Sequence, residues 1–99
     1  MKFSYSVFKQ DKETLLAVSD ADIVGKTFEE RDLQLDVSKE FYGSKTGDEK
    51  EIIELLKDAT IINAVGKEII SLLVQKDIIE KKSVIEISGV PHAQIISIR

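Results

Sequence analysis

Pro91 and His92 are the residues of this chain best suited to chemistry, because each is the single residue of its type in the sequence. His92 carries the one side chain whose ordinary pKa lies near neutrality, so it can act as an acid, a base or a hydrogen-bonding contact. A residue before proline favours an extended backbone, and proline suits the second position of a tight turn. The segment 87–94 is therefore predicted to form a rigid turn that presents the His92 imidazole, with a strand on either side.

Three roles are open to His92: structural, ligand-binding and catalytic. A general base needs a group that orients it and a nucleophile within reach. Ser88 and Ser97 lie nearby in the sequence, but neither has the surroundings of a nucleophile elbow. Glu86 could lie across the hairpin from His92 or from Gln94. We favour the structural role over a binding contact, and a binding contact over catalysis.

Phe41 and Tyr42 form a pair of adjacent aromatic residues just before a flexible segment. One ring is expected in the core, and the other could stack on a nucleobase or on a side chain of a partner. Core and edge packing of the pair is the favoured interpretation. Asn63 is a polar residue in an apolar segment, where it could cap a helix, bond to a loop or line a site. The first two of these roles are favoured.

Two further segments resemble ion-binding motifs but lack essential positions. Gly25-Lys26-Thr27 looks like the end of a phosphate-binding loop, yet Asp20 stands where the motif requires a glycine. We interpret Gly25 as the end of a helical turn and Lys26 as a solvated side chain. The segment 20–36 is acidic, but its spacing matches no calcium loop, so we interpret it as a solvated edge.

The composition is typical of one globular domain, residues 1–99, with 42% apolar and 32% charged residues. The absence of cysteine excludes disulfides, thiolate zinc sites and cysteine nucleophiles, and it suits a reducing cytoplasm. The net charge of −4, with basic residues interleaved among acidic ones, argues against non-specific DNA or RNA binding. The N-terminus lacks the pattern of a signal peptide, and no apolar run approaches the ~18 residues of a spanning helix. We therefore expect a cytoplasmic protein with no membrane partner, metal or cofactor.

The periodicity of apolar residues divides the chain into strands and helices. Alternating residues predict strands, and apolar residues three and four positions apart predict helices. We predict strands at 1–9, 14–18, 33–37, 84–87 and 94–98. A helical turn capped by Asp20 is predicted at 21–24. One helix is predicted to begin with a capping box at 46–49 and to continue to Ala59, and a second to run from Asp58 or Thr60 to about Lys76. The last strand has little polar surface and is expected inside the sheet.

This order of elements predicts an α+β fold: a mainly antiparallel sheet of about five strands with two main helices packed on one face. Gly66 falls within the second predicted helix, where glycine costs roughly 1 kcal/mol relative to alanine. We infer that the backbone at Gly66 closely approaches a strand or a neighbouring helix.

Four parts of the sequence resemble a known family: Val24–Phe28, Leu35–Ser38 with Phe41–Gly43, Ala59–Asn63 with Gly66, and Gly89–Gln94. Together they are similar to a small archaeal family catalogued only as a domain of unknown function, and the resemblance covers nearly the whole chain. It implies an archaeal, cytoplasmic, single-domain protein, and it supplies no activity, cofactor or catalytic residue. These parts fall in predicted turns and helix starts, and such positions carry function more often than core positions do.

We therefore expect these turns to form one composite surface, and a non-enzymatic binding module is the leading hypothesis. The surface would contain Lys26, Phe41, Tyr42, Asn63, Gly89, Pro91, His92 and Gln94. Its partner would be a protein or a structured RNA of the translation apparatus. The first alternative is a small enzyme in which His92 acts as acid or base on a phosphorylated or nucleoside substrate held by Lys26. The second is a structural protein that forms homodimers through an apolar edge strand or helix face, since the sequence leaves the oligomeric state open.

Overall fold

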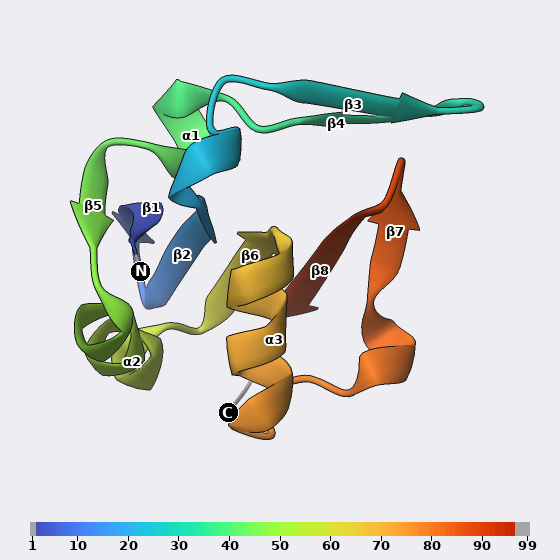
Figure 1. Ribbon diagram of the computed structural model, residues 1–99. Coiled ribbons are helices and arrows are strands. Elements are labelled where there is room, and N and C mark those ends of the chain that lie inside the picture. Colours follow the sequence, from blue (N-terminus) through green and yellow to red (C-terminus); the bar gives the residue numbers. More distant parts are fainter. Residues whose placement is uncertain (1, 97–99) are drawn as a thin grey trace.

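A six-stranded sheet forms the centre of the protein in the computed structural model, which describes residues 2–96 (Figure 1). Its strands are β1 (Phe3–Gln10), β2 (Glu13–Asp20), β5 (Lys45–Gly47), β6 (Ile61–Val65), β7 (Ile85–Ile87) and β8 (Val90–Ile96), in the spatial order β5-β1-β2-β6-β8-β7. Neighbouring strands are antiparallel except β2 and β6, which are parallel. The predicted α+β class with a mainly antiparallel sheet is confirmed, although the sheet has six strands rather than about five.

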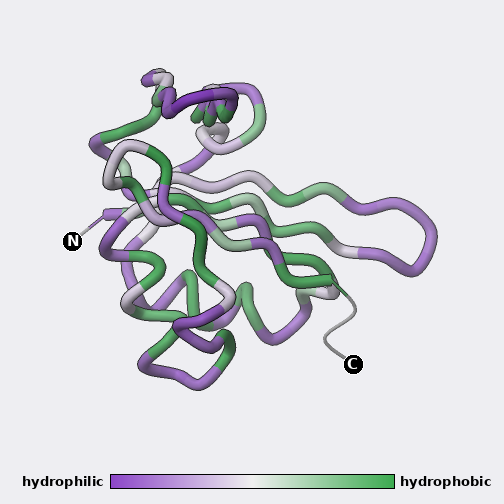
Figure 2. The backbone as a smooth tube through the Cα atoms, turned by 90° about the vertical axis from the view of Figure 1, so that its right-hand side faces the viewer, coloured by the Kyte–Doolittle hydropathy of each residue, from purple (hydrophilic) through white to green (hydrophobic). Residues whose placement is uncertain are grey.

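Two helices, α2 (Glu49–Asp58) and α3 (Lys67–Gln75), pack on one face of the sheet, which we call the helix face. Strand residues alternate between the two faces of a sheet, so every second residue of β1, β2 and β6 points toward these helices. The main core contains Phe3, Tyr5, Leu16, Val18, Ile62 and Ala64 from the strands and Ile52, Leu56, Ile69, Ile70, Leu72 and Leu73 from the helices. In Figure 2 the hydrophobic residues lie along the strands, whereas the turn between β1 and β2 is hydrophilic.

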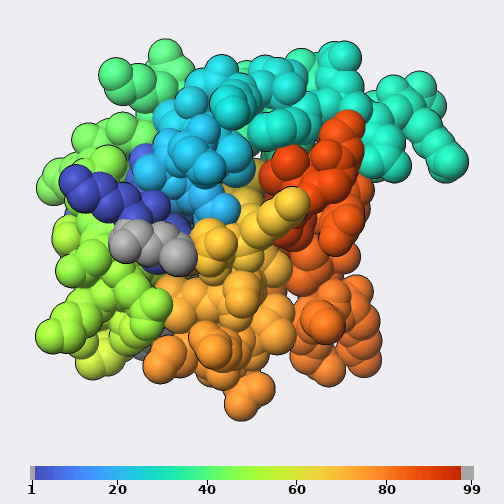
Figure 3. Space-filling model, viewed as in Figure 1, coloured from blue at the N-terminus to red at the C-terminus, as the bar shows by residue number. Residues whose placement is uncertain are grey.

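The opposite face of the sheet, which we call the hairpin face, is partly covered by short elements. These are a 3-10 turn η1 (Ala21–Ile23), a separate two-stranded sheet of β3 (Thr27–Glu30) and β4 (Leu33–Asp36), and the short helix α1 (Lys39–Tyr42). A second core lies beneath them and contains Ala17, Leu35, Val37, Tyr42, Val65 and Ile87. The strand predicted at 33–37 corresponds to β4, but it pairs with β3 instead of joining the main sheet. Figure 3 shows the β3–β4 hairpin projecting from one side of the molecule.

The second predicted helix is wrong in its first half. Residues 61–65 form β6, which pairs with both β2 and β8, and α3 begins only at Lys67. The apolar residues here fall at helical spacing, but a short segment rich in β-branched residues also suits a buried strand. Gly66 separates β6 from α3 with a φ of +127°, a conformation that a helix interior does not contain.

Asp20 stabilises a different helix from the one predicted. Its side chain does not cap the turn that begins at Ala21. Instead its carboxylate oxygens accept backbone hydrogen bonds from Glu68 (3.0 Å) and Ile69 (2.9 Å) at the start of α3. A Cβ placed on Gly66 would lie 2.4 Å from the Asp20 carboxyl carbon. The inferred close approach of Gly66 to a strand is therefore confirmed, and the contact is made by the Asp20 side chain at the end of β2.

The helix α2 begins two residues later than predicted. Its cap is Asp48, whose carboxylate accepts a hydrogen bond of 3.0 Å from the backbone N of Glu51. Thr46, the predicted cap, lies in β5 and pairs with Ser4 of β1. This three-residue edge strand is too short to show a period in the sequence. Because the predicted strand 33–37 lies outside the main sheet, β5 and β6 together bring that sheet to six strands.

The turn of the final hairpin lies at Ser88 and Gly89, where both residues have positive φ angles (51° and 80°). Two successive positive φ angles are typical of the tightest hairpin turns, so the chain reverses before the proline is reached. Pro91 and His92 therefore lie in β8 and not in the predicted turn. β8 lies between β6 and β7, as expected for an interior strand, and a 3-10 turn η2 (Lys81–Ser83) precedes β7. The ends of two predicted strands, Met1 and residues 97–98, lie outside the described residues.

Candidate functional site

One cross-strand row on the hairpin face contains Ser6, Ala17, Asn63 and Gln94, from β1, β2, β6 and β8. Directly paired residues of neighbouring strands share a face, so Asn63 and Gln94 present adjacent amide side chains. We call these two residues the amide pair. Asn63 is half-buried and Gln94 is exposed, whereas Ser6 and Ala17 are buried. The row therefore runs from a covered end on β1 to an open end on β8.

The segment that includes α1 covers the closed end of this row. The backbone N of Ser44 donates to Ser6 Oγ (3.1 Å), and the Ser44 hydroxyl donates to the same oxygen (2.8 Å). The Tyr42 hydroxyl donates to Asn63 Oδ1 at 2.5 Å. Burial raises the pKa of Tyr42 to about 12, so this phenol keeps its proton and remains a donor at neutral pH. The Asn63 amide nitrogen is left with two N–H donors for other partners.

Two stacked aromatic rings extend this surface. The Phe8 and Phe41 rings are nearly parallel, with an interplanar angle of 15° and centroids 5.5 Å apart. The Phe41 and Tyr42 rings are nearly perpendicular, with an interplanar angle of 89° and centroids 4.8 Å apart. Tyr42 belongs to the second core and Phe41 is half-buried, so one ring of the predicted aromatic pair is in the core and the other lies at the surface.

A second row crosses the same four strands beside the amide pair. It contains Phe8, Leu15, Ile61 and Ile96, and we call it the apolar row. Phe8 is 42% exposed and Ile96 is 63% exposed, while the two residues between them are half-buried. A hollow of about 380 Å³ borders the row, and Asp11 and Glu13 line its far side. Among the described residues, the hairpin face thus has a partly exposed apolar strip that crosses four of the six strands.

His92 lies on the hairpin face one row away from the amide pair, with Val65 and Ile85 as its cross-strand neighbours. Diagonal neighbours in adjacent strands lie about 7–8 Å apart, which places His92 beside Asn63. The His92 Nδ1 is 3.1 Å from the carbonyl oxygen of Ala64. Because a carbonyl can only accept, Nδ1 carries the hydrogen, and the neutral ring keeps Nε2 as an acceptor.

The hypothesis that His92 is catalytic expected the Glu86 carboxylate to lie across the hairpin from the imidazole, and it does not. Glu86 pairs with Pro91 and points to the helix face, so it does not lie across the hairpin from His92 or Gln94. The reason is the position of the turn, which sets the register of the hairpin so that Ile85 faces His92. Within residues 2–96, the imidazole has a hydrogen bond to a carbonyl and none to a carboxylate.

Three predicted site residues lie away from both rows. Pro91 is buried and points to the helix face, because successive residues of β8 alternate. Gly89 lies in the β7–β8 turn, which is attached to the β3–β4 hairpin by a hydrogen bond of 2.7 Å from Ser88 N to Glu30 Oε1. Lys26 is exposed between η1 and β3 and lines a separate hollow near the start of α3.

The apolar row was missed by sequence reasoning, although one signal was present. In the strand predicted at 1–9, residues 3, 5 and 7 are apolar and residues 4 and 6 are polar, so Phe8 departs from the polar pattern of its face. Leu15 and Ile61 join Phe8 only through the parallel pairing of β2 with β6. That pairing depends on the crossover between distant segments, which periodicity does not reveal.

Within the described residues, no group of three or more histidine, aspartate or glutamate side chains is arranged to hold a metal ion. No helix between residues 2 and 96 has both the length and the apolar character that crossing a membrane requires.

Fold and surface together define a small α+β domain with one mixed sheet and a partly exposed apolar row. The chain belongs to the family described as protein of unknown function (DUF424), whose model matches residues 8–98. This confirms the resemblance to a family known only as a domain of unknown function. The fold is similar to that in the crystal structure of an uncharacterized conserved protein from the archaeon Methanopyrus kandleri, with a TM-score of 0.78 and 24% sequence identity over 96% of this chain and 90% of that chain. A comparison with curated proteins found no match.

Proposed function

We propose that the protein is a non-catalytic binding module that docks a partner protein on the open part of the hairpin face. The apolar row is the observation that carries this proposal. Its two ends, Phe8 and Ile96, are 42% and 63% exposed, and the row is continuous between them. Contiguous apolar residues that remain uncovered on a folded domain commonly mark interfaces.

The neighbouring residues supply the polar part of such an interface. The amide pair offers hydrogen-bond donors and acceptors, and its Asn63 member is held in place by Tyr42. His92 uses Nδ1 internally and leaves Nε2 for a further hydrogen bond, and Phe41 offers an aromatic ring. Protein interfaces combine an apolar centre with polar groups at the rim, and aromatic residues are enriched in them.

The charge of this surface favours a protein partner over a structured RNA. Neither row contains a basic residue, and the hollow beside the apolar row is bordered by the acidic Asp11 and Glu13. RNA binding needs lysine and arginine contacts with phosphates, which a surface of this kind does not supply. The cysteine-free sequence suits a reducing compartment, and we propose the cytoplasm as the setting.

Two matched substitutions test the proposal. Ile96 is 63% exposed in the apolar row, and Leu33 is 53% exposed on β4 outside it, so Ile96→Asp and Leu33→Asp place the same charge on similarly exposed apolar positions. Partners captured from native lysate by wild type and by each variant are compared by quantitative mass spectrometry. We expect Ile96→Asp to reduce capture of a partner at least about tenfold, because an unpaired carboxylate would be buried in the interface. Leu33→Asp should retain that partner.

Two results would contradict this proposal. One is an identical set of captured proteins for wild type and both variants. The other is a concentration-dependent dimer in sedimentation velocity that Ile96→Asp dissociates. This second result would assign the apolar row to another copy of the chain and would support the homodimer alternative.

A further inference from the structure

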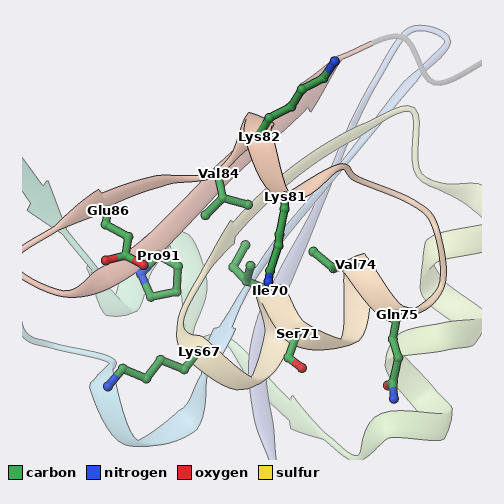
Figure 4. A pocket seen from close by; sticks show the side chains of 10 residues that line it. All are labelled: Lys67, Ile70, Ser71, Val74, Gln75, Lys81, Lys82, Val84, Glu86 and Pro91. Atoms are coloured by element: carbon green, nitrogen blue, oxygen red, sulfur yellow. The ribbon is translucent and has the colours of Figure 1, made fainter.

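A groove on the helix face lies on the opposite side of the sheet from the apolar row. It has a volume of about 670 Å³, within the range of ligand pockets. One wall is α3, and the other is formed by β7, β8 and the η2 turn. Figure 4 shows the lining side chains, which come from these separate elements. The predicted site residue Pro91 is part of this lining.

The floor of the groove is apolar. Ile70 and Pro91 are buried at its base, and Val74 and Val84 are half-buried on its two walls. Within residues 2–96 the helix layer on this face ends at α3, and no helix lies over β7 (Figure 1). The groove therefore occupies the place beside α3 where a further helix would pack on the sheet.

The rim of the groove is basic, although the chain as a whole has a net charge of −4. Lys67, Lys81 and Lys82 line it, against one carboxylate, Glu86. Among the described residues Lys67 and Lys81 have no ion pair, and Lys82 lies 3.9 Å from Glu80 with both side chains at least 75% exposed. Such an exposed pair contributes little, so the rim can attract an acidic ligand.

The directions of the lysine side chains favour an extended distribution of negative charge over a compact anion. In Figure 4 the Lys81 ammonium points across the groove toward Ser71, whereas those of Lys67 and Lys82 point outward at different ends. A phosphate group would need donors that converge on one point. Separate cations around an apolar floor instead match carboxylates spaced along a polypeptide segment.

The length of the groove sets the size of this segment. Its lining on α3 runs from Lys67 to Gln75, eight residue steps or about 12 Å of helix. We propose that the groove binds an acidic amphipathic helix of a partner protein, which packs beside α3 with apolar side chains on Ile70, Val74 and Val84 and carboxylates toward the lysines. About two turns of that helix would contact the groove, so binding is expected to be weak and to depend on salt.

The experiment uses two synthetic peptides of about twelve residues, or three helical turns. Both carry leucine at positions i, i+3, i+4 and i+7, and the remaining positions are mostly glutamate in one peptide and glutamine in the other. Each is titrated into the ¹⁵N-labelled protein while amide chemical shifts are followed. We expect the glutamate peptide to shift amides of α3, η2 and β7, and the glutamine peptide to bind at least about fivefold more weakly.

Three variants locate the binding. Lys81→Glu should weaken the glutamate peptide about tenfold, because an attraction becomes a repulsion. Lys50→Glu makes the same charge change at an exposed position on α2 and should leave affinity within about twofold. Ser71→Tyr adds a ring at an exposed position of the groove wall, so it should block binding without removing a core contact.

The proposal is overturned if both peptides bind equally well or if Lys50→Glu weakens binding as much as Lys81→Glu. It is also overturned if the shifted amides map to the hairpin face or if peptide at about 1 mM causes no saturable shift. Because the groove and the apolar row lie on opposite faces, Ile96→Asp should not change the titration. The two proposals can therefore fail separately.

Discussion

Tyr42 lies at the boundary between the covered part and the open part of the hairpin face. Its ring lies in the second core, and its hydroxyl reaches Asn63, where the open part begins. A part-buried polar group that loses its partner costs about 1–3 kcal/mol, so this hydrogen bond holds the Asn63 side chain in one orientation. Gln94, the exposed member of the amide pair, therefore lies beside an Asn63 side chain whose orientation is fixed.

Both tyrosines of the folded protein should ionise near pH 12 instead of near the ordinary value of 10. A hydrogen bond to the Glu51 carboxylate, together with burial, raises the pKa of Tyr5, and burial alone raises the pKa of Tyr42. A titration of the ultraviolet absorbance of tyrosinate measures this directly, because the chain has two tyrosines and no tryptophan. A tyrosine that ionises near pH 10 while circular dichroism shows an intact fold would contradict the expectation.

The same pKa values predict how stability depends on alkaline pH. The folded protein holds these protons more tightly than the unfolded chain does, so the tyrosine contribution to the free energy of unfolding is complete below pH 10 and is lost as the pH rises from 10 to 12. Tyr42→Phe should make this decline shallower in urea denaturation curves. An unchanged slope in the variant would show that Tyr42 does not titrate in this way.

At the scale of single residues, the sequence indicated which side chains to examine but not where they lie. Phe41, Tyr42, Asn63, His92 and Gln94 were all singled out, and all five lie on the hairpin face. Their grouping follows from cross-strand register, whereas the sequence reasoning placed His92 in a turn. Pro91 was grouped with His92 because it is adjacent in the chain, and adjacent strand residues point to opposite faces.

The junction of β2, β6 and α3 is the element-scale feature on which the fold most depends. Asp20 at the end of β2 caps α3 through the backbone N atoms of Glu68 and Ile69. Gly66 leaves room for this carboxylate, since a Cβ there would lie 2.4 Å from the Asp20 carboxyl carbon. The end of β2 thus fixes the start of α3, although α3 follows β6 in the chain.

A double-mutant cycle tests this junction by urea denaturation. Asp20→Ala should lower the free energy of unfolding by about 1–2 kcal/mol through loss of the cap. Gly66→Ala should cost more in the wild type than in the Asp20→Ala background, with a coupling energy of about 1 kcal/mol or more, because the clash with the carboxylate disappears. Backbone strain from the positive φ remains in both backgrounds.

Gly25→Ala is the matched control for this cycle. Gly25 also has a positive φ of +91°, but a Cβ there would meet no atom within 4 Å. Its cost should therefore be the same with and without Asp20, within about 0.5 kcal/mol. Equal costs of Gly66→Ala in the two backgrounds would show that Asp20 and Gly66 do not interact as described.

Elements were predictable from the sequence where one periodicity dominated a segment. The β1–β2 hairpin, α2 and the interior position of β8 follow from patterns within the chain. β6 was predicted as helix because its apolar residues and those of α3 continue at helical spacing across Gly66. Gly66 itself was evidence against one continuous helix, because it separates the end of β6 from the start of α3. β3 and β5 are short and largely polar or exposed, so they carry no periodic signal.

At the scale of the whole molecule, the sheet separates two surfaces of different chemistry. The hairpin face presents apolar and amide groups beside the acidic Asp11 and Glu13, and the helix face presents an apolar groove with a basic rim. The pairing of β2 with β6 brings the residues of the apolar row together on the hairpin face. The groove on the helix face exists because the helix layer ends before it reaches β7. Because the surfaces lie on opposite faces, one partner on each could be held at the same time.

The most direct test of the account is site-specific photo-crosslinking from the open hairpin face. A photoreactive amino acid replaces Gln94 in one protein and Leu33 in another; both positions are exposed, and Gln94 lies in the proposed docking surface. After irradiation in native lysate, position 94 should yield a discrete crosslink to a protein of another sequence, and Ile96→Asp should abolish it. Position 33 should not yield that product. The same crosslink from both positions, or a crosslink from position 94 that survives Ile96→Asp, would contradict the proposal that the apolar row and the amide pair form a protein-binding surface.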